Sequence, residues 1–199
     1  MSSLKAVSIS FVIMLSMGCE KIELPEDINV NCVAAFADQP DPGEFGYATF
    51  LLNGEETRCV AEGQSRRPGT VDIKMHVFDE TCYRTAKVRV TKLALDRSPY
   101  RIDTFWTRCD SFAPLGTVFD WERLIFSYQD HDAALAFYYV DPERSGYEAR
   151  VTDYNAKRKI VKGVFSGDFI YDDSCWSNPL YAQDSLITIT DGYFEVYLR

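Results

Sequence analysis

The sequence predicts a single all-β domain, an antiparallel β-sandwich or sandwich-like barrel of about ten or eleven strands. Beyond residue 45, apolar and polar residues alternate with a period of two, as in antiparallel strands with one solvated face. Turn-forming residues separate these segments at intervals of about eight to twelve residues. No convincing helical period, internal repeat or low-complexity tract competes with this pattern.

Individual strands follow from the alternation. The clearest one covers residues 71–77, where apolar side chains occupy the odd positions and polar side chains the even ones. The alternation over residues 87–95 changes parity near Lys92, which predicts a β-bulge there. Two further strands are predicted over residues 133–139 and 147–151.

Glycine-containing dipeptides predict how the strands are joined. Asn53-Gly54 lies between two strand-like segments, and Asn-Gly has the positive φ angles that a type I′ hairpin turn needs. Asp191-Gly192 lies where the apolar positions switch from odd to even numbers, which requires either a tight turn or a glycine bulge. Gly163 falls among apolar residues on one strand face, where we expect it to leave room for a neighbouring ring.

The first residues of the chain predict export. Lys5 precedes an apolar run of about a dozen residues, which is typical of a secretory signal and shorter than the roughly 20 residues of a membrane-spanning helix. The run ends in Leu15-Ser16-Met17-Gly18-Cys19, which resembles a bacterial lipoprotein signal with its large aliphatic residue one place further out than usual. The resemblance implies cleavage before Cys19 and lipidation of its thiol. The alternative is an ordinary cleaved secretory signal.

Lipidation would set the organisation of the mature protein. Residues 1–18 would be the signal peptide, residues 19–44 a lipidated acidic tether, and residues 45–199 the β domain. The tether is rich in acidic residues, proline and glycine, and its more apolar middle, residues 28–37, is expected to dock in part on the domain. Two acyl chains suffice for stable anchoring, so we expect a membrane-bound protein. The resemblance to a lipoprotein signal implies the outer membrane, with the domain facing the periplasm or the cell surface.

Charge limits the partners. The chain has a formal net charge of −9 and no basic run with interleaved aromatic residues, so nucleic acid is not expected as a partner. Its overall field also disfavours polyanions and direct binding to anionic lipid. The membrane would be reached through the lipid on Cys19. No sequence pattern indicates a cofactor or a metal site.

Five cysteines follow the lipid attachment site, in a compartment where thiols tend to pair. The simplest count is two bridges and one thiol that is either buried or available for an intermolecular bond. In an antiparallel meander, the loops that hold Cys82, Cys109 and Cys175 fall at one end, because each lies an even number of strands from the next. Cys32 and Cys59 lie away from that end. Cys82 with Cys109 is therefore the predicted bridge.

Few residues suggest catalysis. His76 lies on the polar face of its strand, where we expect a solvated side chain, and His131, between Asp130 and Asp132, is expected in a polar hairpin loop. The familiar hydrolase, zinc-protease and nucleotide-binding motifs do not occur. The sequence therefore favours a binding or structural module at the cell envelope. The alternative is an envelope hydrolase of glycans or peptides, with carboxylates that the sequence does not single out.

Three tryptophans supply the candidate ligand site. The same parity argument gathers Trp106, Trp121 and Trp176 at one end of the domain. Tryptophan stacks well on a sugar ring or an apolar peptide side chain, so we predict a shallow groove for a glycan or peptide, with Asp110 and Asp172 at its rim. The alternative is that the indoles are part of the core, because tryptophan is buried on average.

Several C-terminal segments carry a resemblance. Residues 146–153, residues 160–167 and the stretch ITITDGYFEVYL at residues 187–198 are similar to a family of uncharacterised Bacteroidota lipoproteins. An opening at residues 45–55 that contains Phe-Gly-Tyr and Asn-Gly-Glu matches the family as well. The resemblance implies an all-β domain on a lipid anchor and no assigned activity.

Overall fold

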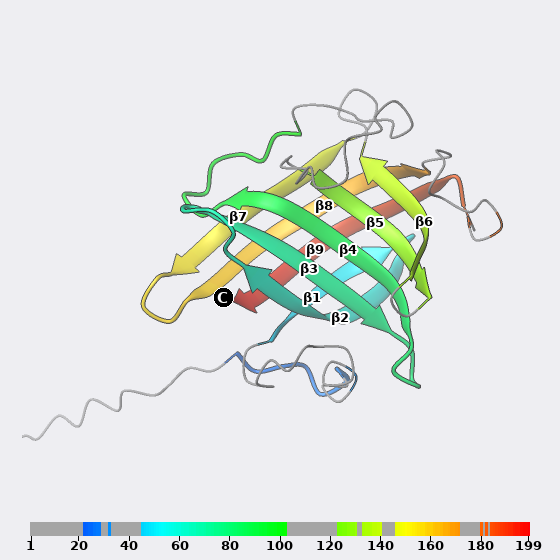
Figure 1. Cartoon of the computed structure of the whole chain (residues 1–199), viewed down its shortest axis with the longest axis horizontal. Helices are drawn as coiled ribbons and strands as arrows, with labels where there is room; N and C mark the ends of the chain where they lie inside the picture. Colours follow the sequence, from blue (N-terminus) through cyan, green and yellow to red (C-terminus); the bar gives the residue numbers. More distant parts are fainter. Residues whose placement is uncertain are drawn as a thin grey trace, which may run out of the picture.

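The computed structural model describes residues 22–28, 32, 45–102, 123–130, 133–140, 146–171, 180, 182 and 184–199. Within these ranges the chain forms nine antiparallel strands, which confirms the all-β fold class (Figure 1). They are β1 (Gly46–Leu52), β2 (Glu55–Gln64), β3 (Thr70–Phe78), β4 (Arg84–Ala94), β5 (Arg123–Asp130), β6 (Ala133–Val140), β7 (Tyr147–Asn155), β8 (Ile160–Tyr171) and β9 (Leu186–Tyr197).

The strands form one sheet in the order β6-β5-β4-β3-β2-β1-β9-β8-β7. β8 also pairs with β6, so the sheet closes on itself in a barrel-like arrangement. β7 pairs with residues 160–167 of β8, and β6 pairs with residues 169–171. One long strand therefore has β9 along one edge, and β7 and β6 in succession along the other (Figure 1).

The count of nine described strands is below the expected ten or eleven, and β9 gives one reason. The apolar runs on either side of Asp191-Gly192 belong to a single strand that is interrupted by a bulge. Asp191 has a φ of 53°, and the pairing with β8 shifts between Phe165 and Gly167. Of the two alternatives for Asp191-Gly192, the bulge is correct.

The other register signals are confirmed. Asn53 and Gly54 have φ angles of 51° and 86°, as a type I′ turn between β1 and β2 requires. Lys92 has a φ of 56°, and the pairing of β3 with β4 shifts beside it. The bulge places the backbone N–H of Lys92 2.9 Å from Oδ1 of Asp72, to which it donates a hydrogen bond.

Side chains from every strand form one apolar core. Phe126 packs edge-on against Tyr138 and Phe169, with ring centroids 5.7 and 6.3 Å apart. Gly163 lies opposite Phe194, and a Cβ atom there would collide with the phenylalanine ring. The room expected beside Gly163 is therefore filled by an aromatic side chain. The largest fully buried residues are Tyr138, Phe126, Phe165, Phe169, Phe194, Ile73, Met75, Leu93, Leu124, Ile187, Ile189 and Val71.

The segment before β1 docks on this domain. We call residues 22–28 together with Cys32 the N-terminal strap, which is the blue segment in Figure 1. The N–H of Ile22 donates to the hydroxyl of Tyr197 at 2.8 Å, and Ile28 packs with Phe45 and Val60 in a second apolar cluster. The partial docking expected for residues 28–37 is confirmed at Ile28 and Cys32, the two residues of that range that the structure describes.

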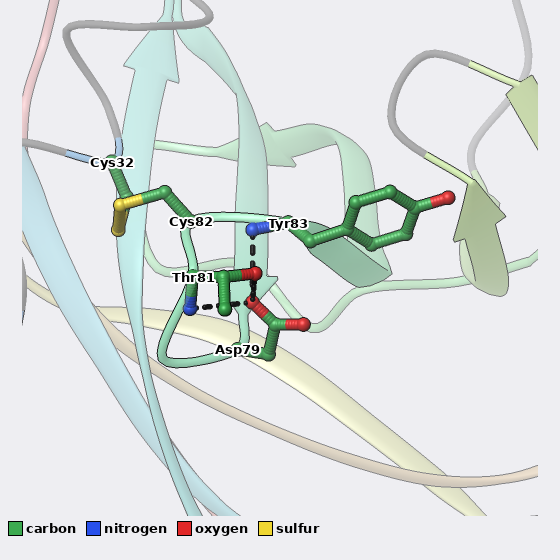
Figure 2. The surroundings of a disulfide bond; sticks show 5 residues. All are labelled: Cys32, Asp79, Thr81, Cys82 and Tyr83. Atoms are coloured by element: carbon green, nitrogen blue, oxygen red, sulfur yellow. Dashed lines mark hydrogen bonds between the residues drawn. A yellow bond between two sulfur atoms is a disulfide. The ribbon is translucent and has the colours of Figure 1, made fainter.

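Cys82 is bonded to Cys32, so the predicted bridge between Cys82 and Cys109 is wrong (Figure 2). The parity argument compared only the loops between strands and placed Cys32 away from the end of the domain that holds Cys82. The strap instead leads back to the turn between β3 and β4. Asp79 shapes that turn by accepting hydrogen bonds from the backbone N–H groups of Thr81 and Tyr83 at 2.8 and 3.0 Å (Figure 2).

Candidate functional site

The residues predicted for the anchor and the groove lie outside the described part of the chain. The lipid anchor Cys19 and the groove therefore stay predictions. His131 lies outside the described residues as well, so its expected place in a hairpin loop stays a prediction. The groove residues concerned are Trp106, Trp121, Trp176, Asp110 and Asp172.

A different set of polar residues comes together on the outer side of the sheet. The register places Glu62 of β2 opposite Lys74 of β3, and Lys74 opposite Arg89 of β4. Two residues further along β3, on the same face, His76 lies opposite Lys87 of β4. Side chains at successive rungs of one face are neighbours. We call this set the charged face of β2–β4, and its members are Glu62, Asp72, Lys74, His76, Arg84, Lys87 and Arg89.

A bulge adds Arg84 to the charged face. Val77 pairs with Ala86, but Phe78 pairs with Arg84, so β4 contains one extra residue at this point. Such a bulge re-aims the side chains beyond it. The guanidinium of Arg84 consequently lies beside His76, with 3.4 Å between NH1 and Nδ1, although the residue is only 8% exposed.

Glu62 is an anion at the centre of the charged face. Its Oε1 lies 3.2 Å from both Nζ of Lys74 and Nε2 of His76. The hydrogen bond from His76 and the charge of Lys74 lower the pKa of Glu62 to about 2, against the opposing effect of burial. Glu62 is therefore ionised throughout the physiological pH range.

His76 is a neutral connector in this network. Burial lowers the pKa of His76, and the charges of Lys87 and Arg84 act in the same direction. Glu62 can only accept and Arg84 can only donate, so Nε2 carries the proton and Nδ1 accepts. The side chain is 15% exposed. The expectation of a solvated surface histidine is wrong, because the long neighbouring side chains cover the ring.

Lys87 is the least satisfied member of the charged face. Its side chain is half-buried, and burial together with the charges of Lys74, Arg84 and Arg89 lowers its pKa to about 8. In the described part of the chain, its ammonium group takes part in no hydrogen bond or ion pair. Within the described ranges, the Lys87 ammonium therefore has three cations near it and no partner of its own.

Arg89 is also incompletely paired. Its NH2 lies 3.5 Å from Oδ2 of the buried Asp72, which Arg66 approaches as well, at 3.4 Å. The Nε group of Arg89 is buried and has no hydrogen-bond partner among the described atoms. Buried N–H groups are nearly always paired in folded proteins, so an orphan calls for a water molecule, an ion or a ligand group.

The sequence signal for this site is the alternation of basic residues on β3 and β4, but its meaning becomes clear only from the pairing of the two strands. Lys87 and Arg89 alternate on β4 as any solvated strand face does, and Lys74 and His76 do so on β3. Only the register shows that Lys74, Lys87 and Arg89 meet on one face. Among the described residues, these three cations share the face with the carboxylates of Glu62 and Asp72, in a chain whose formal net charge is −9.

The chemistry of the charged face suits ionic recognition better than proton transfer. Both ring nitrogens of His76 are occupied, and Glu62 holds its charge against protonation. Nor does a described thiol act as a nucleophile, because burial raises the pKa of the free Cys59 to about 12. Of the two fates expected for an unpaired thiol, Cys59 shows burial.

Two other kinds of site are absent from the described residues. No group of three or more His, Cys, Asp or Glu side chains in these ranges is arranged to hold a metal ion. Nor does any helix within them have the length and apolar character needed to span a bilayer. No protein-family model, curated protein or solved structure matches the chain.

Proposed function

We propose that the chain is a lipid-anchored binding module of the cell envelope, held in the outer membrane through Cys19. The resemblance of residues 15–19 to a lipoprotein signal supports the anchor. The Cys32–Cys82 disulfide supports an oxidising compartment, since such bonds are rare in the cytosol. The family resemblance of the C-terminal strands supports the same combination of an anchor and a β domain.

The observation that carries a binding role is Lys87, whose ammonium has no hydrogen-bond or ion-pair partner among the described residues. A half-buried lysine among three other cations destabilises the folded chain, and strongly perturbed groups of this kind gather at functional sites. The charged face lies on three paired strands, which hold its side chains in a fixed register. A rigid surface with unsatisfied donors fits a binding module.

The anchor is tested by replacing Cys19 with serine in the full-length chain and separating membranes from soluble protein. We expect the Cys19→Ser variant to lose acyl labelling and to leave the membrane fraction, while a Cys59→Ser control stays in it. Two acyl chains bind a membrane almost irreversibly, so nearly all of the control protein, and almost none of the Cys19→Ser variant, should be found in the membrane fraction. Membrane association that persists in Cys19→Ser would sink the anchoring proposal.

Binding is tested with the soluble Cys19→Ser chain against panels of glycans and peptides. The protein must keep its strap, because Cys32 is bonded to the β3–β4 turn. A shortened chain that begins at residue 45 would lack this bond. Binding without chemical change in the ligand supports the module, whereas turnover of a glycan or peptide would establish the hydrolase alternative.

A further inference from the structure

The charged face has the spacing of a site for one small anionic group. Lys87 and Arg89 are two residues apart on β4, so their Cα atoms are about 6.8 Å apart, and both side chains leave the same face. Lys74 lies directly opposite Arg89, at a Cβ distance of about 5 Å. Long basic side chains at these positions can converge on a single carboxylate, sulfate or phosphate.

The donors that would meet such a group are reachable. The side chains of Arg89 and Lys74 are 35% and 21% exposed, and Lys87 is also partly exposed. Lys74 already has a partner in Glu62, but the ammonium of Lys87 and the Nε of Arg89 have none among the described residues. One oxyanion would contact the Lys87 ammonium and the partly exposed Arg89 side chain at once, although the Nε of Arg89 itself is buried.

The negative charge of the whole chain does not prevent this. Mobile ions screen exposed charges beyond about 8 Å at physiological ionic strength, so a bound anion senses mainly its immediate neighbours. Among the described residues, those neighbours are the cations Lys74, Lys87 and Arg89 and the carboxylates of Glu62 and Asp72, each of which is already paired. The local field is therefore positive while the distant field is negative.

We propose that the charged face of β2–β4 is an anion-binding site that takes an oxyanion group, with Lys87 and Arg89 as its direct ligands and Lys74 as an auxiliary one. Glu62 and His76 act as positioning residues, because they hold Lys74 and Arg84 in place. This inference rests on the proposed binding role and names the chemistry of the ligand. An acidic sugar and a phosphorylated lipid headgroup share that chemistry.

Pyridoxal 5′-phosphate is a suitable chemical probe, because it joins an oxyanion to an aldehyde. A lysine amine adds to the aldehyde and releases water to give an imine, which borohydride reduces to a stable secondary amine. On the soluble Cys19→Ser chain, we expect Lys87 to be labelled ahead of Lys157 and Lys159 in the β7–β8 turn. Pyrophosphate should protect it, and pyridoxal, which lacks the phosphate, should label it far less. Equal labelling of all three lysines would contradict the proposal.

Affinity separates the sources of the anion. Calorimetric titration of the same chain would use pyrophosphate, an oligogalacturonate, a sulfated oligosaccharide and vesicles of phosphatidylglycerol. For each probe that the parent chain binds, we expect Lys87→Met and Arg89→Met each to raise the dissociation constant about tenfold or more. This is the usual effect of losing a charged hydrogen bond. Lys157→Met, in the distant turn, should change nothing. Binding of the oligosaccharides alone identifies a glycan, and binding of the vesicles alone identifies a headgroup.

Folding controls keep the test decisive. Lys87→Met removes charge repulsion, so it should fold at least as stably as the parent chain while it loses anion binding. A parent chain that binds none of the four probes, or a Lys87→Met variant that binds like Lys157→Met, overturns the inference. Anchoring through Cys19 is measured separately by fractionation. A chain that stays anchored and binds a neutral glycan or peptide from the panels, but none of the anionic probes, would refute this inference and leave the binding module intact.

Discussion

Lys87 lies directly opposite His76 in the ladder between β3 and β4, so an unpaired ammonium group faces a neutral imidazole. Neither residue neutralises the other. The negative charge of Glu62 acts on Lys87, but Lys74 and His76 already engage that carboxylate. Charge on Lys87 consequently costs folding free energy.

The Lys87→Met variant should therefore be more stable than the parent chain at pH 7. Methionine keeps an apolar stem of similar length and removes the charge, for a gain of about 1 kcal/mol in the free energy of unfolding. Urea unfolding measures it. Lys159→Met, in the β7–β8 turn, should leave the stability within about 0.5 kcal/mol. A clear loss of stability in Lys87→Met would mean that Lys87 has an important partner.

The difference in unfolding free energy between Lys87→Met and the parent chain should decrease as pH rises. The pKa of Lys87 is about 8 in the folded chain and near 10.5 in the unfolded chain, so the unfolded chain binds more protons between these values. The cost of charging Lys87 is complete below pH 8 and disappears as pH rises to 10.5. The advantage of Lys87→Met should shrink over this interval. A difference that stays constant from pH 7 to 10.5 would argue against the lowered pKa.

Charge on Glu62 should stabilise the fold, whereas charge on Lys87 destabilises it, and this stabilisation should be lost at acid pH. Its pKa is lowered to about 2 from 4.5, so its stabilising charge is fully present above pH 4.5 and is lost as pH falls towards 2. We expect Glu62→Gln to lose about 1–2 kcal/mol at pH 7, and to match the parent chain near pH 2. Glu148→Gln removes an exposed ion pair with Arg150 and should change stability by at most about 0.5 kcal/mol.

The disulfide should contribute a large share of the stability. Cys32 and Cys82 are separated by 50 residues, and closing a loop of that size stabilises a fold by about 2–4 kcal/mol. Cys32→Ser should lower the unfolding free energy by this amount, as measured by urea unfolding beside the parent chain. If Cys109→Ser, and not Cys32→Ser, released a titratable thiol at Cys82, the pairing would be disproved.

Gly163 provides a test of the core. A methyl group at this position meets the Phe194 ring and the carbonyl oxygen of Arg150, so Gly163→Ala should destabilise the fold by about 1–3 kcal/mol. Gly146→Ala is a matched control, because the added methyl group would have no atom within 4 Å. Thermal unfolding of the two variants should separate them. Equal melting temperatures would contradict the packing described for β8 and β9.

Local signals predicted the fold well because they depend on neighbouring residues. Asn53-Gly54 needs positive φ angles wherever it lies, and the parity change beside Lys92 can only be absorbed by an extra residue. The Asp191-Gly192 pattern was compatible with a turn or a bulge, because both move the apolar positions from odd to even residue numbers. The choice between them depended on pairing with β1 and β8, which local sequence does not contain.

The candidate site could not be predicted for the same reason. Lys87 and Arg89 have the spacing of an ordinary solvated strand face, and nothing in β4 alone shows that Lys74 and Arg84 approach them. The disulfide depended on an even longer-range arrangement, because it joins the strap to the turn between β3 and β4, 50 residues further along the chain. The charged face and the disulfide both depend on tertiary contacts between segments whose local sequence patterns occur in many proteins.

The pairing of β1 with β9 also affects how the domain folds. These strands are far apart in the sequence but adjacent in the sheet, so a large loop must close before their ladder can form. Contacts of this kind slow folding. Until residues 186–197 arrive, one edge of β1 is an unpaired β-template that can join another chain. Chaperone demand and aggregation should therefore be greatest for the nascent chain, and should fall sharply once β9 has closed the sheet.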